Sequence, residues 1–337
     1  MQRPEFVLVT GAFGNIGRCV VRRLVQDGFR VRAFDLPMPA TQRAARDLPD
    51  GVDTCFGDVT RGGDVARAVC GVHAVAHFAG VLPPVSERKP SLTRAVNLEG
   101  TRALVQAAVR ERADMPFVFA SSCSVYGPSQ HERGLARGDS PTEATDVYTE
   151  TKLGAEAILR ASSLAWVILR VGAAIEGRAW ATDPIVLRLM FEIDPANPIE
   201  LVHGEDVALA TARALVVSDA HRKILPIGGG VTCRLTQRQL IETTLASIGV
   251  TDLPDSAFGT GAYYTSWLDT DEAQRLLDFQ KHDFARIRDA MDARFARWRP
   301  VVRLVAPIVR FGLLRLSGPH RGAPSRPSWQ ALIDAGH

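Results

Sequence analysis

Short apolar runs alternate with longer stretches of helical periodicity over the first half of the chain. After Thr10, for example, apolar side chains recur at Ile16, Cys19, Val20 and Leu24, a spacing typical of a helix with one buried face. The intervening runs are almost continuously apolar, which is typical of parallel strands covered on both faces. The pattern predicts strands over 6–9, 31–34, 54–56, 74–78, 117–120 and 166–170, and helices over 16–26, 63–69, 97–112 and 148–161. We therefore expect an α/β protein with a doubly wound parallel sheet.

The regular alternation ends after residue 171. The remaining pattern predicts strands over 199–202 and 224–227 and helices over 206–217, 236–248 and 269–277. We expect a first domain over 1–171, to which the stretch 199–230 returns, and a smaller substrate-binding portion made of 172–198 and 231–300. Residues 301–337 form a basic, apolar C-terminal extension, and the last twenty residues are rich in turn-forming types.

The segment Trp298–Leu316 combines apolar residues with regularly placed arginines. One interpretation is an amphipathic helix that lies on a membrane surface. The other, which we favour, is a helix packed on its own domain or on a partner subunit, with the arginines reaching into solvent. Pro307 and Gly312 argue against a single straight helix in either case.

Composition narrows the function classes only slightly. The 337 residues are 46% hydrophobic and 23% charged, and the net charge of +3 gives no electrostatic argument for nucleic-acid binding. The five cysteines are scattered without a C-x-x-C pair, so we expect reduced thiols and no metal site. The apolar run from Phe6 leaves no room for a signal peptide, and no apolar stretch is long enough for a spanning helix. These features predict a cytoplasmic protein.

A glycine-rich turn lies between the first predicted strand and the first predicted helix. Gly11 permits a tight turn, Gly14 allows close approach of a pyrophosphate, and Gly17 lets the helix pack near the sheet. The helix N-terminus adds free N–H groups and the positive end of its dipole. Three glycines can also simply form a turn, but the strand and helix around them favour a dinucleotide site.

Two aspartates follow at strand ends. Asp35, about twenty residues beyond the turn, is placed to hold the ribose hydroxyls and would repel a 2′-phosphate, which favours NAD over NADP. Arg30 and Arg32 on the same predicted strand weaken that preference. Asp35 can alternatively be an ordinary turn residue. Asp58 is either an adenine contact or a helix cap.

Tyr148 and Lys152 are four residues apart on a predicted helix, so their side chains share one face. A phenol with a pKa of about 10 is a poor base at neutral pH. A nearby ammonium and a positively charged nicotinamide would lower the pKa of Tyr148. Tyrosine and lysine are both rare in this chain, which makes a chance Y-x-x-x-K pair improbable.

A serine cluster, Ser121-Ser122-Cys123-Ser124, follows the fifth predicted strand. Open α/β sheets bind ligands beyond the carboxyl ends of their strands, where a hydroxyl can polarise a substrate carbonyl. A serine-capped turn is the alternative for any single residue of the cluster.

Together, the T-G-x-x-G-x-x-G turn at Thr10–Gly17, the S-S-x-x-V-Y-G segment and the Y-x-x-x-K pair resemble the extended short-chain dehydrogenases/reductases, the NAD-dependent epimerase/dehydratase family. The resemblance covers roughly 5–230 and implies a Rossmann-type sheet and a homodimer. It implies Tyr148 as general acid/base, Lys152 as its partner and ribose ligand, and Ser122 as the substrate-orienting hydroxyl. The remaining cofactor contacts that it implies are Gly11, Phe13, Gly14, Asn15, Ile16, Gly17, Asp35, Asp58, Val59, Ala79 and Asn97. For the substrate it implies Val81, Ser122, Ser124, Gly172 and Ala173.

The chain departs from the nucleotide-sugar enzymes of that family at two places. No asparagine follows Leu169-Arg170, and the stretch 178–201 is shorter than the usual nucleotide-recognition insert. Both departures argue against a diphosphate substrate. We expect NAD-dependent hydride transfer on a secondary alcohol or ketone of a small-molecule substrate, foremost a sugar or sugar derivative. The alternatives are oxidation or reduction of a steroid-like apolar alcohol, and a non-catalytic dinucleotide sensor or scaffold.

Overall fold

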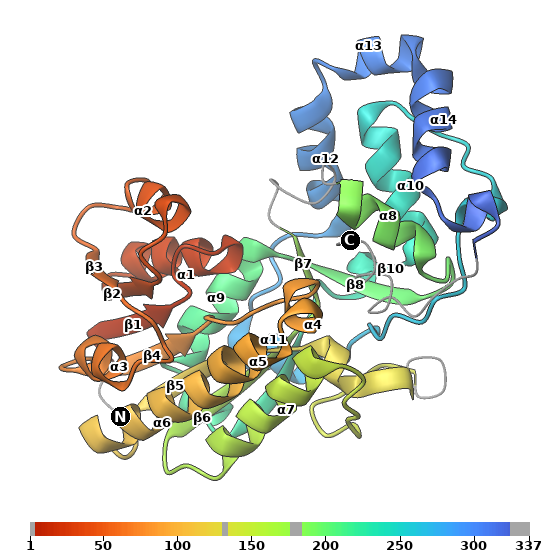
Figure 1. The fold of residues 1–337 in the computed structure, drawn as a ribbon. Helices are drawn as coiled ribbons and strands as arrows, with labels where there is room; N and C mark the ends of the chain where they lie inside the picture. Colours follow the sequence, from red (N-terminus) through yellow and green to blue (C-terminus); the bar gives the residue numbers. More distant parts are fainter. Residues whose placement is uncertain (1–3, 130–133, 176–183, 324–337) are drawn as a thin grey trace.

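The computed structural model describes residues 4–129, 134–175 and 184–323. Its centre is a seven-stranded sheet in which every neighbouring pair is parallel (Figure 1). The strand order is β3-β2-β1-β4-β5-β6-β9. The strands are β1 Phe6–Thr10, β2 Arg30–Asp35, β3 Asp53–Phe56, β4 Ala74–His77, β5 Pro116–Ser122, β6 Ala165–Val171 and β9 Lys223–Ile227. The predicted doubly wound α/β fold is confirmed, and all six strands predicted in the first half are present.

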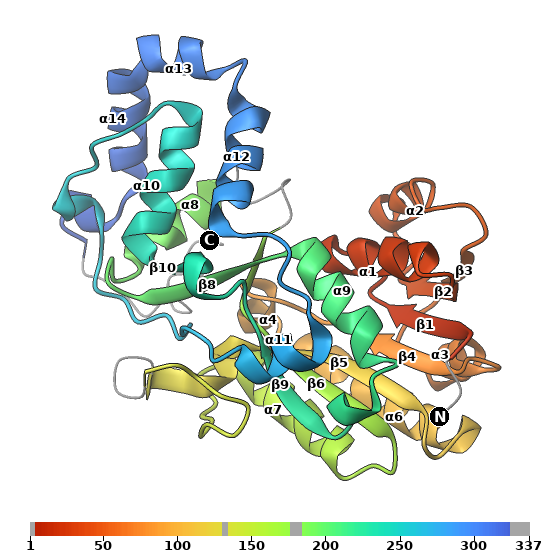
Figure 2. The same ribbon diagram turned by 180° about the vertical axis from the view of Figure 1, so that it is seen from behind.

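Helices cover both faces of this sheet because the side chains of each strand alternate between two cores. Val7 and Val9 of β1 belong to one core, while Phe6 and Leu8 belong to the other. The first core is closed by α1 Asn15–Gln26, α9 Gly204–Ala214 and α11 Asp271–Leu277, which face the viewer in Figure 2. The second is closed by α3 Gly62–Val69, α6 Thr101–Glu111 and α7 Val147–Arg160, which are in front in Figure 1.

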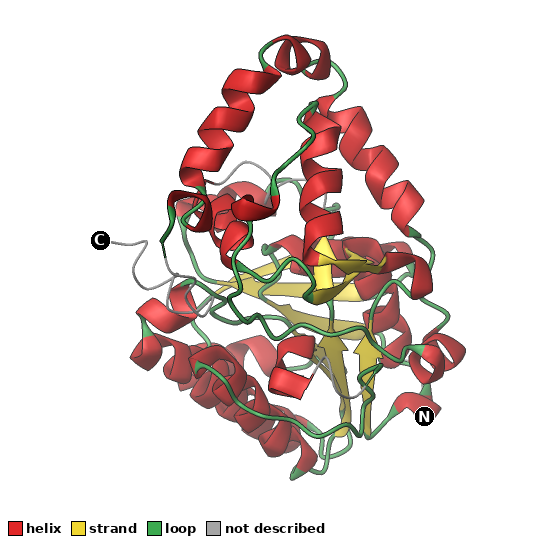
Figure 3. Cartoon of the chain, turned by 90° about the vertical axis from the view of Figure 1, so that its right-hand side faces the viewer, coloured by secondary structure: helices red, strands yellow, loops and turns green. Residues whose placement is uncertain are grey.

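A smaller lobe lies above the carboxyl ends of the large sheet (Figure 3). It contains a three-stranded sheet in the order β10-β8-β7, formed by Arg234–Thr236, Pro198–His203 and Ala173–Ile175. Its helices are α8 Pro184–Glu192, α10 Gln237–Ile248, α12 Phe284–Phe295, α13 Arg299–Leu304 and α14 Ala306–Leu316. They enclose a third core that includes Leu201, Leu240 and Met291.

Two segments are assigned differently from the sequence analysis. The strand β8, expected to return to the large sheet with 199–230, pairs instead with β7 and β10 in the small sheet, whereas α9 and β9 do belong to the large domain. Conversely, α11 lies within the stretch 231–300 but packs Ala273 and Leu277 into the core beside α1 and α9. The chain therefore crosses between the lobes more often than the sequence pattern indicates.

The predicted helix over 97–112 begins irregularly. Residues Arg94–Gly100 form a π-helical stretch that continues directly into α6. Such stretches are rare and often lie at functional sites. The short helices α2 Pro39–Ala45, α4 Val85–Arg88 and α5 Pro90–Thr93 were not predicted, because four to seven residues are too few to show a helical period.

The apolar, arginine-containing segment near the C-terminus forms two helices, α13 and α14, which meet at Val305. Pro307 lies in the first turn of α14, where proline is tolerated. Leu313 is buried, and Val302 and Val309 pack against the third core, so one face of the segment is held by its own lobe. Within the described ranges, no helix is long and apolar enough to cross a membrane.

Candidate active site

A cavity of about 630 Å³ lies at the carboxyl ends of the large sheet, where the smaller lobe covers it. Its lining includes the ends of β2, β5 and β6, the loops that follow β1, β3 and β4, two residues of α7, and Ala174 of β7. Ten predicted cofactor residues line it, namely Gly11, Phe13, Gly14, Asn15, Ile16, Gly17, Asp35, Asp58, Val59 and Ala79. So do Val81, Ser122, Tyr148, Lys152 and Gly172.

The glycine turn is glycine for steric reasons. Gly11 has a φ of +66°, and a Cβ there would lie 2.7 Å from the amide nitrogen of Ala79. A Cβ on Gly17 would lie 2.0 Å from the carbonyl oxygen of Gly11. Gly14 caps α1, whose first turn contains no acidic residue. The turn thus leaves the helix N-terminus open to the cavity, as a pyrophosphate group requires.

Asp35 ends β2 beside this turn. One carboxylate oxygen accepts from the amide of Phe13 at 3.0 Å and the other from the amide of Leu36 at 2.8 Å. Burial raises the pKa of Asp35, and these two hydrogen bonds oppose that rise. Arg32 points away, where it binds Asp53 at 2.7 Å. Among the residues that the structure describes, the lining of the cavity includes no arginine that could pair with a 2′-phosphate.

Asp58 is held in a local turn. Its Oδ1 accepts from both the amide and the hydroxyl of Thr60, at 2.9 Å and 2.8 Å. Its own amide donates to Asp64 at 3.0 Å. The adjacent Val59 packs so closely on Gly100 that a Cβ there would lie 2.9 Å from it. Asp58 is therefore not the cap of α3, which is Arg61, and the alternative of an adenine contact remains a prediction for a residue that lines the cavity.

Ser122, Tyr148 and Lys152 converge at one end of the cavity. Ser122 ends β5, and its hydroxyl hydrogen-bonds both Tyr148 and the hydroxyl of Ser124, the latter at 2.8 Å. Lys152, one turn beyond Tyr148 on α7, donates from Nζ to the carbonyl oxygen of Ala120 at 2.7 Å. Its Nζ lies 5.7 Å from the centre of the Tyr148 ring. The three side chains thus come from the strand β5 and from α7, a helix that packs against this strand.

The electrostatics of this group differ from the expectation that Lys152 lowers the pKa of Tyr148. Burial raises the pKa of Tyr148, and the hydrogen bond from Ser122 only reduces that rise. Burial also lowers the pKa of Lys152 to about 8, with Glu156 opposing the change. Nearby, burial and the charge of Lys152 lower the pKa of His77 to about 3. Because desolvation dominates, the protein's own groups keep the phenol protonated.

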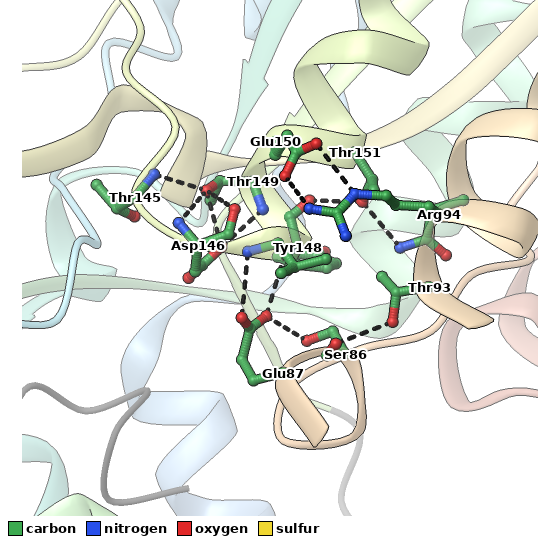
Figure 4. Close-up of polar contacts among 12 residues, drawn as sticks. Ser86, Glu87, Thr93, Arg94, Thr145, Asp146, Tyr148, Thr149, Glu150 and Thr151 are labelled. Carbon is green, nitrogen blue, oxygen red and sulfur yellow. Dashed lines mark hydrogen bonds and ion pairs between the residues drawn. The ribbon is translucent and has the colours of Figure 1, made fainter. Parts of the chain in front are cut away.

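The N-terminus of α7 is held by two carboxylates (Figure 4). Asp146 caps the helix by accepting from the amide of Thr149 at 2.7 Å. Glu87 of α4 accepts from the amides of Val147 and Tyr148, at 3.1 Å and 3.2 Å. Helix N-termini leave such amides without partners inside the helix, and anionic acceptors suit them. Glu87 was not predicted from the sequence, because no pattern around it indicates a contact with residues sixty positions later.

Asn97, on the π-helical stretch, fixes the loop that follows β4. Its side chain accepts from the amide of Val81 at 2.7 Å and donates to the carbonyl of the same residue at 3.0 Å. It also donates to the hydroxyl of Thr151 on α7 at 3.2 Å. Asn97 is buried and does not itself line the cavity, so in this chain it positions Val81 and links the loop to α7.

Part of the lining is apolar. Val81, Leu82, Leu92 and Val96 contribute to it, and Leu82 remains 59% exposed at the mouth. From β7 the contributor is Ala174, whereas the predicted Ala173 packs against the core of the smaller lobe. The reason is strand alternation, which sends neighbouring side chains to opposite faces. Leu82, Leu92 and Val96 were not predicted, because single apolar residues on a loop and on short helical segments form no pattern.

The chain resembles known proteins both in sequence and in structure. A 3-beta-hydroxysteroid dehydrogenase of Mycolicibacterium neoaurum is 31% identical over 210 residues, which are 59% of this chain and 54% of that protein. The human 3 beta-hydroxysteroid dehydrogenase type 7 is 36% identical over 142 residues, 41% of this chain and 38% of that protein. The chain thus spans about half the length, or less, of the curated relatives it matches.

Among solved structures, the dTDP-glucose 4,6-dehydratase DesIV of Streptomyces venezuelae, with NAD and TYD bound, superposes with a TM-score of 0.73 at 27% identity. The superposition covers 88% of this chain and 98% of that one. A short-chain dehydrogenase/reductase superfamily protein of Agrobacterium tumefaciens, with bound NAD, shares the fold with a TM-score of 0.70 at 23% identity, covering 90% and 99%.

Residues 7–175, half of the chain, match the model of the NAD dependent epimerase/dehydratase family. This range holds the glycine turn, Ser122, Tyr148 and Lys152, which the structure brings to one cavity. The chain therefore belongs to the NAD-dependent epimerase/dehydratase family.

Proposed function

We propose that this protein is an NAD-dependent oxidoreductase that interconverts a secondary alcohol and the corresponding ketone. The observation that carries the proposal is the convergence of Ser122, Tyr148 and Lys152 in the cavity that also contains the glycine turn. A nucleotide-binding turn alone would suit a sensor, whereas a hydroxyl, a phenol and an ammonium at the far end of the same cavity suit proton transfer.

The residues of the turn fit a dinucleotide. Side chains at Gly11 and Gly17 would fill the space next to the helix N-terminus, so their absence leaves backbone amides accessible to a pyrophosphate. Asp35 lines the same cavity and would hold the adenosine ribose, and the described part of the lining includes no arginine for a 2′-phosphate. This combination supports NAD rather than NADP, and neighbouring structures in the family contain NAD.

The bound nicotinamide would supply hydride acceptance and donation. The Ser122 hydroxyl is placed to donate a hydrogen bond to the substrate oxygen, which orients the reacting carbon. Tyr148 then takes the hydroxyl proton during oxidation and returns it during reduction. Lys152, one turn further along the same helix, would hold the nicotinamide ribose. The positive charge of an oxidised nicotinamide would lower the pKa of Tyr148.

For the substrate, the cavity supports an apolar cyclic alcohol of the steroid class. Val81, Leu82, Leu92 and Val96 give the cavity an apolar part, and no arginine of the described chain lines it to pair with a diphosphate. The two curated relatives described above carry steroid-dehydrogenase names. A sugar or sugar derivative is the second candidate, because DesIV shares most of its length with this fold at 27% identity.

The test compares Tyr148→Phe with Tyr264→Phe, a tyrosine that does not line the cavity. The first variant should abolish turnover and leave NAD affinity within about twofold, since only the reacting proton is removed. The second should resemble the unaltered protein. Retained turnover in Tyr148→Phe would overturn the mechanism. NAD binding without turnover of any alcohol by the unaltered protein would support the sensor alternative instead.

Substrate class is tested with panels of hydroxysteroids and of sugars and uronates, with and without a nucleotide. NADH formation is followed by absorbance, and products are analysed as well, because an epimerase that recycles its cofactor gives no net NADH. Steroid oxidation supports the apolar cavity assignment, and sugar conversion contradicts it. The homodimer and the cytoplasmic location expected from sequence stay predictions, to be checked by light scattering and cell fractionation.

A further inference from the structure

The end of the smaller lobe presents an apolar surface that no other described element covers. It consists of Trp298, Val301, Leu304, Val305, Ile308 and Phe311, which we call the apolar tip. Leu304 is 85% exposed, Ile308 72% and Phe311 59%. Val301 and Leu304 are three residues apart on α13, and Ile308 and Phe311 are three apart on α14, so within each helix the two side chains lie on one side. Soluble proteins rarely expose so many large apolar residues together without a binding role.

The opposite side of the same helices is anchored. Val302, Val309 and Leu313 pack into the third core, and Arg299 ties α13 to Asp292 and to the carbonyl of Ser247. The segment is therefore held in place by the lobe, and the packing of its inner side leaves the apolar tip on the outside. In all three views α13 lies at the end of the molecule farthest from the seven-stranded sheet (Figures 1–3).

The tip is surrounded by positive charge. Between Ala293 and Ile333 the sequence contains eight arginines and neither aspartate nor glutamate. Arg297 stacks on Trp298 and Arg315 on Phe311, so guanidinium groups border the apolar residues directly. Acidic groups of the same lobe near the segment include Asp292, which binds Arg299, Asp252, which lines a hollow together with Arg310, and Glu192, next to Gly318. The positive charge therefore belongs to α13 and α14 themselves, which contain no acidic residue.

We propose that the apolar tip docks on an anionic phospholipid surface. Apolar side chains at the centre enter the boundary between headgroups and acyl chains, and the arginines around them attract anionic lipids. A second copy of this chain is a poorer occupant, because a twofold contact would bring the same arginines face to face. The inference goes beyond the proposed function and does not depend on it, since it rests on residues outside the cavity.

The experiment measures co-sedimentation of the full chain with vesicles, without substrate. We expect binding to vesicles of equimolar phosphatidylcholine and phosphatidylglycerol and little binding to phosphatidylcholine alone. The binding should weaken as salt rises, since screening is effective beyond about 10 Å at 0.1 M. No binding to the anionic vesicles, or equal binding to both compositions, overturns the proposal.

Variants separate the contribution of the apolar side chains from that of the arginines. Replacing both Leu304 and Ile308 with Gln should reduce partitioning at least about tenfold, because two large apolar side chains lose their burial in lipid. Arg315→Gln should reduce it about fivefold, the effect of one arginine near an anionic surface. Val231→Gln, which alters another highly exposed residue on a different element, should bind like the unaltered protein.

Melting temperatures of the variants confirm that they are folded, which is expected because the altered side chains are exposed. If the Leu304/Ile308 variant binds vesicles as well as the Val231 control, the tip is not the docking surface. If vesicle binding is absent and the same variant instead dissolves a dimer seen by sedimentation, the surface is a contact between copies, and the proposal is wrong.

Discussion

Glu87 is expected to stabilise the helix that carries Tyr148 and Lys152. Its two carboxylate oxygens accept separately from the amides of Val147 and Tyr148, at 3.1 Å and 3.2 Å, and the hydroxyl of Ser86 donates to one of them at 2.8 Å. Glu87 lies on α4, and it is buried. Removing it leaves two amides at the start of α7 without an anionic acceptor.

The magnitude follows from the kind of bond that is lost. A hydrogen bond to a charged group contributes about 1.5–3 kcal/mol, so two give about 3–6 kcal/mol as an upper bound. When the side chain is truncated, water can reach the helix end and bind the two amides, so part of this stabilisation is kept. We therefore expect Glu87→Ala to lower the free energy of unfolding by about 3 kcal/mol. Glu87→Gln keeps one acceptor oxygen for two donors and should lose roughly half as much.

Glu150→Gln is the matched control. Glu150 also lies in the first turn of α7 (Figure 4), but its carboxylate is half exposed and pairs with Arg94 at 2.7 Å. Exposed ion pairs contribute about 0–1 kcal/mol, so this variant should change stability little. Urea unfolding without added cofactor measures all three variants. Equal losses for Glu87→Ala and Glu150→Gln would refute the reasoning.

A positioning role for Glu87 has a kinetic consequence as well. If the carboxylate fixes the start of α7, the hydroxyl of Tyr148 shifts when it is removed, and a displacement of about 1 Å can reduce kcat about 100-fold. NAD affinity should change little, because the glycine turn lies on other elements. A variant that loses stability but keeps kcat would show that Glu87 supports the fold without positioning Tyr148.

Three further predictions concern the fold and the cavity. Gly17→Ala should abolish NAD binding in calorimetry, since its Cβ would lie 2.0 Å from a backbone oxygen, while Gly63→Ala, with open space around it, should be tolerated. Arg170→Met should lower the free energy of unfolding by about 3–5 kcal/mol in urea, because it leaves the carboxylate of Glu156 unpaired and buried, and adding Glu156→Leu should restore part of that loss. Since burial lowers the pKa of His77 to about 3, stability should fall as pH drops below about 6.5, by up to about 1.4 kcal/mol per pH unit, and His77→Gln should show a shallower fall.

Features set by neighbours in the sequence could be predicted from it. The glycine turn is a local steric requirement, and the structure shows it directly at Gly11 and Gly17. Tyr148 and Lys152 were paired by helical spacing alone, which the helix α7 preserves. The six strands of the first half followed from continuous apolar runs, because a buried parallel strand has no polar face.

Features that depend on contacts between residues far apart in the chain could not be predicted from the sequence. Glu87 reaches α7 across about sixty residues, and the pattern around it reads as an ordinary surface loop. The placement of β8 depends on which sheet offers it a partner, and an apolar run of four residues is equally suited to both. The apolar wall of the cavity was missed for the same reason, since Leu82 and Leu92 lie on separate short elements.

The electrostatics of the site suggest an order of events that neither the motif nor the fold reveals alone. Burial raises the pKa of Tyr148 and lowers those of Lys152 and His77, so each of these groups resists carrying charge. Ser122 is the one protein group among these that favours the phenolate by hydrogen bonding. Lys152, with a pKa of about 8, still carries its charge at neutral pH, and a further positive charge near Tyr148 would lower the pKa of the phenol. An oxidised nicotinamide would supply that charge, so we expect the ionisation of Tyr148 to move to lower pH when NAD⁺ binds.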